Sequence, residues 1–215
     1  MPKPAIRGHI HTHGYRPMAL ALLVLGLGWA GQDASANRPD HAGLTATTNE
    51  IDGYVRSQAR YRVPAVEMID NLGKPASLAK LLEGDNPVML NFIFTSCGAI
   101  CPVMSATFAK VQADIGPAGK DLLLVSISID PEQDTPLALR NYARYYGAGP
   151  RWKMLTGKAS DSIAVQRAFD TYRGDKMNHA PVTFMRAHPG QPWVRIEGFA
   201  NADDLIREYR KLAAK

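Results

Sequence analysis

Cysteine is scarce in this sequence: its 215 residues contain only two, Cys97 and Cys101, with three residues between them. The chain also has no low-complexity tract and no internal repeat, and its composition is ordinary for a globular protein, with 46% hydrophobic and 21% charged residues. Repeat and low-complexity architectures are therefore excluded. The close spacing of the only two cysteines has three possible explanations: a structural disulfide, a redox pair or part of a metal site.

A strong excess of one charge is absent as well. The whole chain has 25 basic and 20 acidic residues, and residues 37–215 alone have 22 and 19, a net charge of +3. Such a small excess argues against nucleic acid or an anionic membrane surface as the main partner.

The apolar run Met18–Gly31 has 14 residues, fewer than the roughly 20 that cross a bilayer comfortably. Basic residues precede this run, and Ala34 and Ala36 form a small-x-small site after it, a pattern typical of secretory signals. We expect residues 1–36 to be a signal peptide or, if uncleaved, an N-terminal membrane anchor. The protein would then be exported to the periplasm, soluble or tethered to the inner membrane. In an oxidising compartment, close cysteines form a disulfide unless they are reduced or hold a metal.

Residues 37–62 are polar and irregular and are expected to be a leader, which leaves 63–215 as one domain. Hydrophobic periodicity predicts strands at 87–94, 121–129 and 153–155, a hairpin of 181–187 with 193–199, and helices at 101–115, 134–147, 160–172 and 203–215. This order predicts an α/β sandwich of thioredoxin type, whose mixed central sheet is flanked by helices.

Both cysteines follow the strand at 87–94, at the edge of the sheet where α/β proteins place their sites. Pro102 is tolerated in the first turn of a helix, so the helix begins near Cys101 and Cys97 lies in the turn before it. The free N–H groups and the dipole of that helix favour thiolates, which both a redox pair and a soft-metal site require. A structural disulfide closing so short a loop would contribute only about 2 kcal/mol.

A metal site needs more ligands than two thiolates, and an imidazole beside them would favour Cu(I) or zinc. Of the three histidines beyond the signal, His41 lies in the leader and His188 in the hairpin turn. His179 directly precedes the strand at 181–187, which adjoins the cysteine helix in a thioredoxin-like sheet. We therefore expect His179 to reach the thiols.

Two methionines could add sulfur ligands. Met104 has the spacing of a core residue on the cysteine helix, whereas Met177 is open as a ligand. A peroxidase would also place a thiol after a strand, but no arginine stands in a recognisable motif to activate a peroxide.

The segments "FTSCGAICP" (94–102), "SISIDPEQDTP" (126–136) and "DKMNHAPVTF" (175–184) carry a family resemblance. Their order and spacing resemble the Sco/SenC family of copper-handling proteins, which are thioredoxin-like in fold, from about Val63 to the end of the chain. The resemblance implies one copper ion held by two thiolates and one imidazole. Its implied use is delivery of copper to the binuclear centre of cytochrome c oxidase, or reduction of the cysteines of that centre before loading.

By this resemblance the copper ligands would be Cys97, Cys101 and His179. Asp130 matches the acidic residue of a family loop and would orient the site or a partner, although it could equally begin the turn before the next helix. The residues 98–100 between the cysteines depart from the Pro-Asp pair that family members often carry, which puts local thiol acidity and partner contacts in doubt.

Two functions therefore stay open. The first is a periplasmic copper chaperone, carrying Cu(I) or Cu(II) to a client, a copper subunit of cytochrome c oxidase. The alternative is a thiol-disulfide reductase, in which one cysteine attacks a client disulfide and the other resolves the mixed disulfide. Pro181 stands where thioredoxin-type oxidoreductases place a cis-proline, and a cis Ala180–Pro181 bond would favour the exchange role.

Overall fold

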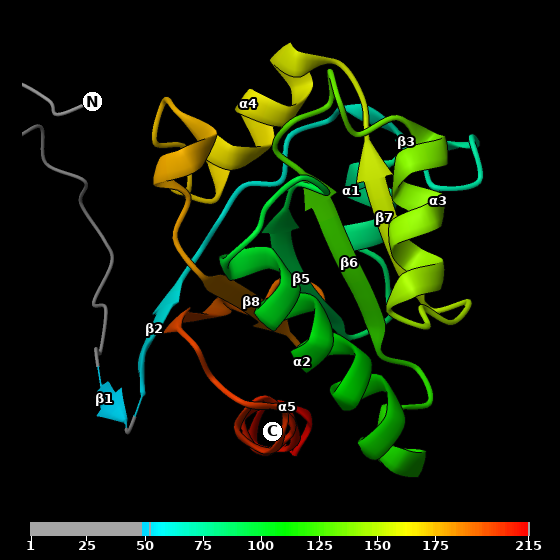
Figure 1. The fold of residues 1–215 in the computed structure, drawn as a ribbon. Coiled ribbons are helices and arrows are strands. Elements are labelled where there is room, and N and C mark those ends of the chain that lie inside the picture. Colours follow the sequence, from blue (N-terminus) through cyan, green and yellow to red (C-terminus); the bar gives the residue numbers. More distant parts are fainter. Residues whose placement is uncertain (1–48, 52, 215) are drawn as a thin grey trace, which may run out of the picture. The chain divides into compact units, whose positions relative to one another are not determined.

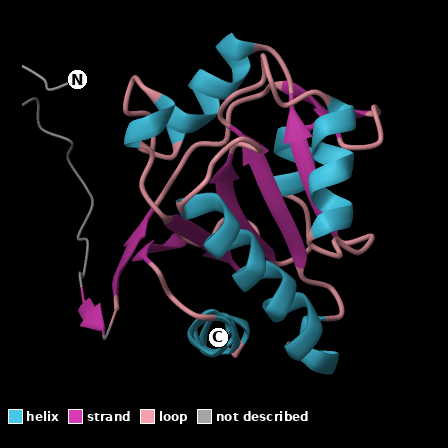
Figure 2. Cartoon of the chain, viewed as in Figure 1, coloured by secondary structure: helices cyan, strands magenta, loops and turns pink. Residues whose placement is uncertain are grey.

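The computed structural model describes residues 49–51 and 53–214. Its elements are arranged as helices packed on a mixed sheet (Figures 1 and 2). The strands are β1 (Asn49–Ile51), β2 (Tyr54–Ala59), β3 (Glu67–Asp70), β4 (Pro75–Ser77), β5 (Val88–Ile93), β6 (Leu123–Ser128), β7 (Trp152–Thr156), β8 (Val182–Arg186) and β9 (Trp193–Gly198). The helices are α1 (Leu78–Leu82), α2 (Ile100–Asp114), α3 (Pro136–Tyr145), α4 (Ala159–Ala168) and α5 (Ala202–Ala213), with short 3₁₀ turns η1 (Gly116–Gly119) and η2 (Lys176–Asn178).

Within the described part of the chain, nine strands form one sheet in the order β1-β2-β9-β8-β5-β6-β7-β3-β4. The central strands β5, β6 and β7 are parallel to one another, whereas β8 pairs antiparallel with β5 and with β9. Every residue of β5 and β6 is buried, because helices cover both faces of the sheet. The continuous apolar runs in the sequence arise from this burial.

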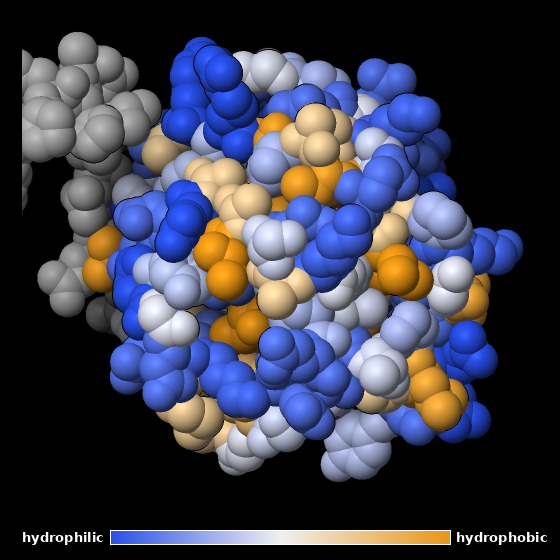
Figure 3. Space-filling model, turned by 90° about the horizontal axis from the view of Figure 1, so that it is seen from above, coloured by the Kyte–Doolittle hydropathy of each residue, from blue (hydrophilic) through white to orange (hydrophobic). Residues whose placement is uncertain are grey.

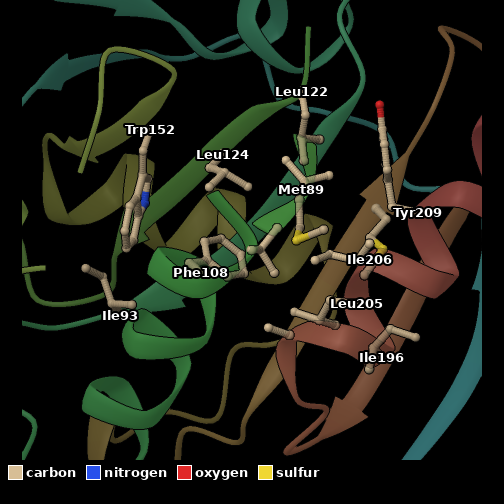
Figure 4. Packing of buried hydrophobic residues seen from close by; sticks show 14 of the residues in the cluster. Met89, Ile93, Phe108, Leu122, Leu124, Trp152, Ile196, Leu205, Ile206 and Tyr209 are labelled. Carbon is tan, nitrogen blue, oxygen red and sulfur yellow. The ribbon is translucent and has the colours of Figure 1, made fainter. Parts of the chain in front are cut away.

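Side chains alternate between two cores along each central strand. Met89 and Ile93 of β5 face the core that α2, α3 and α5 cover, while Leu90 and Phe92 face the core covered by α1 and α4. Figure 4 shows the first core, where Phe108 of α2 packs near Met89 and Leu124. The two-residue period of the strands thus produces the three-layer sandwich.

Most element boundaries predicted from the sequence are confirmed. Thr135 caps α3 by accepting a hydrogen bond from the backbone N–H of Ala138, and Pro136 begins the helix. Gly147 follows α3 with φ +65°, a conformation that favours glycine. Helix α4 is shorter than predicted, because it ends at Ala168 and Asp170 adopts a positive φ of 51°.

The expectation of an irregular leader through residue 62 differs from the structure. Strand β2 lies inside that segment and pairs antiparallel with β9 along its whole length, from Tyr54 opposite Gly198 to Ala59 opposite Trp193. Most residues of β2 are only half buried, so no apolar run marks the strand in the sequence. The folded domain therefore begins before Val63. Strands β3 and β4 and helix α1 were not predicted either.

The expected signal peptide or anchor at 1–36 lies outside the described residues, and so does His41. In the part of the chain that the structure describes, no helix has the length and apolar character needed to cross a membrane.

Candidate metal and thiol site

The two cysteines lie at the carboxyl end of β5, in the turn that leads into α2. The backbone N–H of Cys97 donates to the carbonyl of Phe94 at 3.1 Å, which closes the turn. The backbone N–H of Cys101, in the first turn of α2, donates to Cys97 Sγ at 3.3 Å. Both residues are free thiols. Cys97 is partly exposed, whereas Cys101 is fully buried.

Burial and hydrogen bonding together shift the pKa values of the two thiols in opposite directions. Burial raises the pKa of Cys97, but hydrogen bonds from the backbone N–H groups of Cys101 and Ala99 outweigh it, and the net pKa lies below the ordinary value. Burial raises the pKa of Cys101 far above its ordinary value, and a charged Cys97 and Asp134 add to the effect. Cys97 is therefore the thiol that ionises first.

His179 is the third residue of the predicted site, and the structure brings it to Cys101. Its Nε2 lies 3.7 Å from Cys101 Sγ, a buried contact between residues 78 positions apart in the chain. The imidazole ring packs edge-on against Phe94, with 6.3 Å between ring centroids. Burial lowers the pKa of His179, which favours the neutral ring that binds metals.

The three predicted ligands are not yet gathered around one point. Among the described residues, no three histidine, cysteine or acidic side chains form a ready metal cluster. The structure joins Cys97 to Cys101, and Cys101 to His179.

Asp130 does not touch the thiols but is connected to the segment that carries His179. Asp130 Oδ2 lies 2.5 Å from Lys176 Nζ, and the carboxyl is nearly buried. The Lys176 ammonium also lies over the ring of Phe94, 5.5 Å from its centroid. A cleft of about 320 Å³ opens beside these residues, with His179 in its wall.

The sequence offered four further candidates, Pro181, Met104, His188 and Met177. No described peptide bond is cis, so the Ala180–Pro181 bond is trans. Pro181 instead accepts a hydrogen bond on its carbonyl from Gly198 N–H. Met104 is buried in the core, as expected, and His188 is exposed in the hairpin turn. Met177 is 72% exposed. On the face of the molecule drawn in Figure 3, apolar residues are scattered among hydrophilic ones.

Sequence reasoning missed a buried polar network beside the cysteines. Asp134, which lies at the start of the helix predicted at 134–147, is fully buried. Its Oδ1 accepts hydrogen bonds from the backbone N–H (3.0 Å) and the hydroxyl (2.6 Å) of Thr95, and its Oδ2 accepts one from the Ser128 hydroxyl at 2.6 Å. The signal in the sequence was weak: Thr95 is a polar residue directly after the strand predicted at 87–94, and Ser128 is a polar residue near the end of the strand predicted at 121–129.

A second missed contact holds the first turn of α2. The Tyr142 hydroxyl, on α3, lies 2.8 Å from Ser105 Oγ and 3.4 Å from the Cys101 carbonyl. Burial raises the pKa of Tyr142 strongly, so the phenol stays protonated and can donate. Helix α3 thereby fixes the turn of α2 that carries Cys101.

Known proteins match both the sequence and this fold. The SCO1/SenC family model matches residues 55–214. A SCO1 protein homolog of Bacillus subtilis is 32% identical over 110 residues, which are 51% of this chain and 56% of that protein. The chain spans about half the length of the curated relatives it matches.

Two solved structures share the fold. One is BsSco, described as a member of the Sco family of cytochrome c oxidase assembly proteins with a disulfide switch; its TM-score is 0.62 at 27% identity, over 73% of this chain and 96% of that one. The other is copper-bound ScoI of Arabidopsis thaliana, with a TM-score of 0.57 at 24% identity, over 69% of this chain and 98% of that one. The thioredoxin-like fold is thus confirmed, and with the family model covering most of its length the chain belongs to the SCO1/SenC family.

Proposed function

We propose that this protein is an exported copper chaperone, which holds one copper ion between Cys97, Cys101 and His179 and passes it to a client. The observation that carries this proposal is the 3.7 Å contact between His179 Nε2 and Cys101 Sγ. An imidazole and a thiol from distant parts of the chain meet beside a second thiol, which itself contacts Cys101 N–H.

The chemistry of the three side chains suits copper. Thiolates are soft ligands that select Cu(I), and imidazole binds copper in both oxidation states. All three groups must be deprotonated to bind. His179 is favoured as the neutral ring and Cys97 as the thiolate, because their pKa values are lowered. Cys101 would give up its proton on binding, and copper would draw Cys97 toward the other two.

The client we propose is the copper subunit of cytochrome c oxidase, since the similar protein BsSco is described as a cytochrome c oxidase assembly protein. Cys97 is the more exposed thiol, so an incoming ligand of the client would replace it first. Asp130 supports the site through its ion pair with Lys176, three residues before His179. Export would depend on residues 1–36 as signal or anchor.

Copper titration of the reduced protein, residues 37–215, against a competing Cu(I) chelator tests the proposal. One equivalent should bind, and Cys97→Ser, Cys101→Ser and His179→Ala should each lower the affinity by at least about 100-fold, more than the loss of an outer-shell contact costs. His188→Ala is the matched control, because His188 is exposed in the hairpin turn, and should bind as the parent does. Absence of tight copper binding by the reduced parent would overturn the proposal.

A thiol-disulfide reductase is the second candidate, and the opposite pKa shifts of the two thiols favour it. A partly exposed, acidic Cys97 beside a buried, weakly acidic Cys101 is suited to attack and then resolution of a mixed disulfide. His179→Ala separates the two roles. Exchange with a disulfide substrate should survive that change if the protein is a reductase, whereas copper affinity should not survive it if the protein is a chaperone.

A further inference from the structure

Asp134 is a fully buried acidic residue in the loop between β6 and α3. Both carboxyl oxygens accept hydrogen bonds, Oδ1 from Thr95 and Oδ2 from Ser128. These contacts include no cation. Burying a carboxyl group costs free energy unless hydrogen bonds compensate, so the placement of Asp134 depends on these donors.

The first connection of Asp134 runs to the cysteine turn, which we define as residues 94–99. Thr95 lies two positions before Cys97 and gives Asp134 both its backbone N–H and its hydroxyl. Two bonds to one residue restrict both the position and the orientation of the chain there. The start of the cysteine turn is therefore tied to the loop after β6.

The second connection runs to the histidine segment, residues 175–179. Ser128 Oγ donates to Asp134 and also accepts from the backbone N–H of Asp130 at 3.0 Å. Asp130 in turn holds Lys176 by the 2.5 Å ion pair. The carbonyl of Lys176 accepts from the backbone N–H of His179 at 3.2 Å. Each bond in this series is shorter than 3.5 Å.

The two connections meet at Asp134. Phe94 adds a contact between the two segments, because the Lys176 ammonium lies 5.5 Å from the centroid of its ring and the His179 ring packs edge-on against it. The cysteines and the histidine come from segments 78 positions apart. Their relative placement depends on what joins those segments, and metal sites lose affinity when such supporting contacts are lost.

We propose that Asp134 is a positioning residue that holds the two halves of the metal and thiol site in register. It fixes the cysteine turn directly and the histidine segment through Ser128 and Asp130. The prediction for copper affinity rests on the proposed function. A second prediction concerns the closure of the Cys97–Cys101 disulfide, which needs no copper.

The test compares Asp134→Asn, which keeps the shape but removes an acceptor, with Glu208→Gln. Glu208 is the matched control, because it is also a fully buried carboxylate but lies on α5 and contacts Arg56 and Lys211. Both variants are measured for unfolding, so that copper affinity is expressed per folded molecule. Asp134→Asn should lower Cu(I) affinity by about 10- to 100-fold, and Glu208→Gln should leave it unchanged.

The second readout is the equilibrium with glutathione. The protein dithiol and one oxidised glutathione give the protein disulfide and two reduced glutathiones; one S–S bond breaks, one forms, and two electrons and two protons pass to glutathione. Asp134→Asn should shift this equilibrium toward the dithiol by roughly tenfold, because a loosened turn brings the thiols together less often. Glu208→Gln should not shift it.

Two milder variants keep the test decisive if Asp134→Asn does not fold. Thr95→Val removes one donor on the cysteine side, and should shift the disulfide equilibrium more than Lys176→Met does. Lys176→Met removes the ion pair on the histidine side, and should lower copper affinity while leaving the disulfide nearly unchanged.

Asp134 variants that match Glu208→Gln in both readouts would overturn the inference, and so would parent-like behaviour of both milder variants. A parent that binds no copper defeats the proposed function alone. The glutathione equilibrium then still decides whether Asp134 positions the cysteine turn.

Discussion

Among the residues that the structure describes, two carboxyl side chains are fully buried, and their surroundings differ. Glu208 of α5 has a cation on each oxygen: Arg56 of β2 donates to Oε2 and Lys211 to Oε1, both at 2.7 Å. Asp134, beside the cysteines, has only the uncharged donors Thr95 and Ser128.

The difference separates a residue that stabilises the fold from one that serves the site. The cations at Glu208 offset its desolvation and attach β2 to α5, so that the negative charge is neutralised where it lies. Asp134 instead bonds to Thr95, in the segment that carries the thiols, and to Ser128. Ser128 is linked through Asp130 and Lys176 to the segment that carries the imidazole. We infer that Glu208 contributes to the stability of the fold, and that Asp134 helps to position the cysteines and His179.

The comparison predicts the largest effect for Glu208→Gln. The change removes the charge that pairs with Arg56, a residue only 17% exposed, and should lower the free energy of unfolding by about 3 kcal/mol. Urea unfolding at neutral pH measures it. Copper affinity of the folded variant should stay within about twofold of the parent, since the change lies on α5. A stability loss below that of Tyr142→Phe would break the comparison.

Glu208 should also contribute to the pH dependence of the free energy of unfolding. Burial raises the pKa of Glu208, but its bonds with Lys211 and Arg56 outweigh this and hold the pKa below the ordinary value of 4.5. A depressed folded-state pKa gives stability that is full above the unfolded-state value and is lost as the pH falls through the folded-state value. The stability difference between parent and Glu208→Gln should therefore narrow in acid. A difference that stays constant down to the acid transition would contradict this account.

The smallest effect is expected for Tyr142→Phe. The change leaves the buried hydroxyl of Ser105 without its 2.8 Å partner and should cost about 1 kcal/mol of unfolding free energy. Tyr145→Phe is the control, because Tyr145 is 82% exposed and should be neutral. Copper affinity should change little, since the bond fixes one helix turn and does not join the two halves of the site. A copper loss as large as that of Asp134→Asn would mean that any bond near Cys101 matters equally.

The sequence predicted the elements that strong local signals define. The buried runs became β5 and β6, Pro136 and Gly147 bounded α3, and the order of elements gave the mixed sheet. Strand β2 was not predicted, because its side chains are mostly half buried and leave no apolar run in the sequence. It forms by pairing antiparallel with β9. Its stability comes from β9 and from the Arg56–Glu208 pair, partners 134 to 152 positions away in the sequence.

For the candidate site, the sequence named the residues whose side chains could bind copper or exchange disulfides, but not the residue that we propose positions them. Cys97, Cys101 and His179 were found from residue type and position. The sequence placed Asp134 only at the start of a predicted helix. Its bond to Thr95, 39 positions away in the chain, could not be recognised from the sequence. A supporting residue has no chemistry of its own to recognise, so three-dimensional contacts were needed to identify it.

The central claim is that one copper ion is held by Cys97, Cys101 and His179, and X-ray absorption on the copper-loaded, reduced protein tests it most directly. The account predicts two sulfur scatterers and one imidazole nitrogen around copper, with the nitrogen lost in His179→Ala and one sulfur lost in Cys97→Ser. A copper shell with a single sulfur, or a nitrogen signal that persists in His179→Ala, would contradict the ligand set.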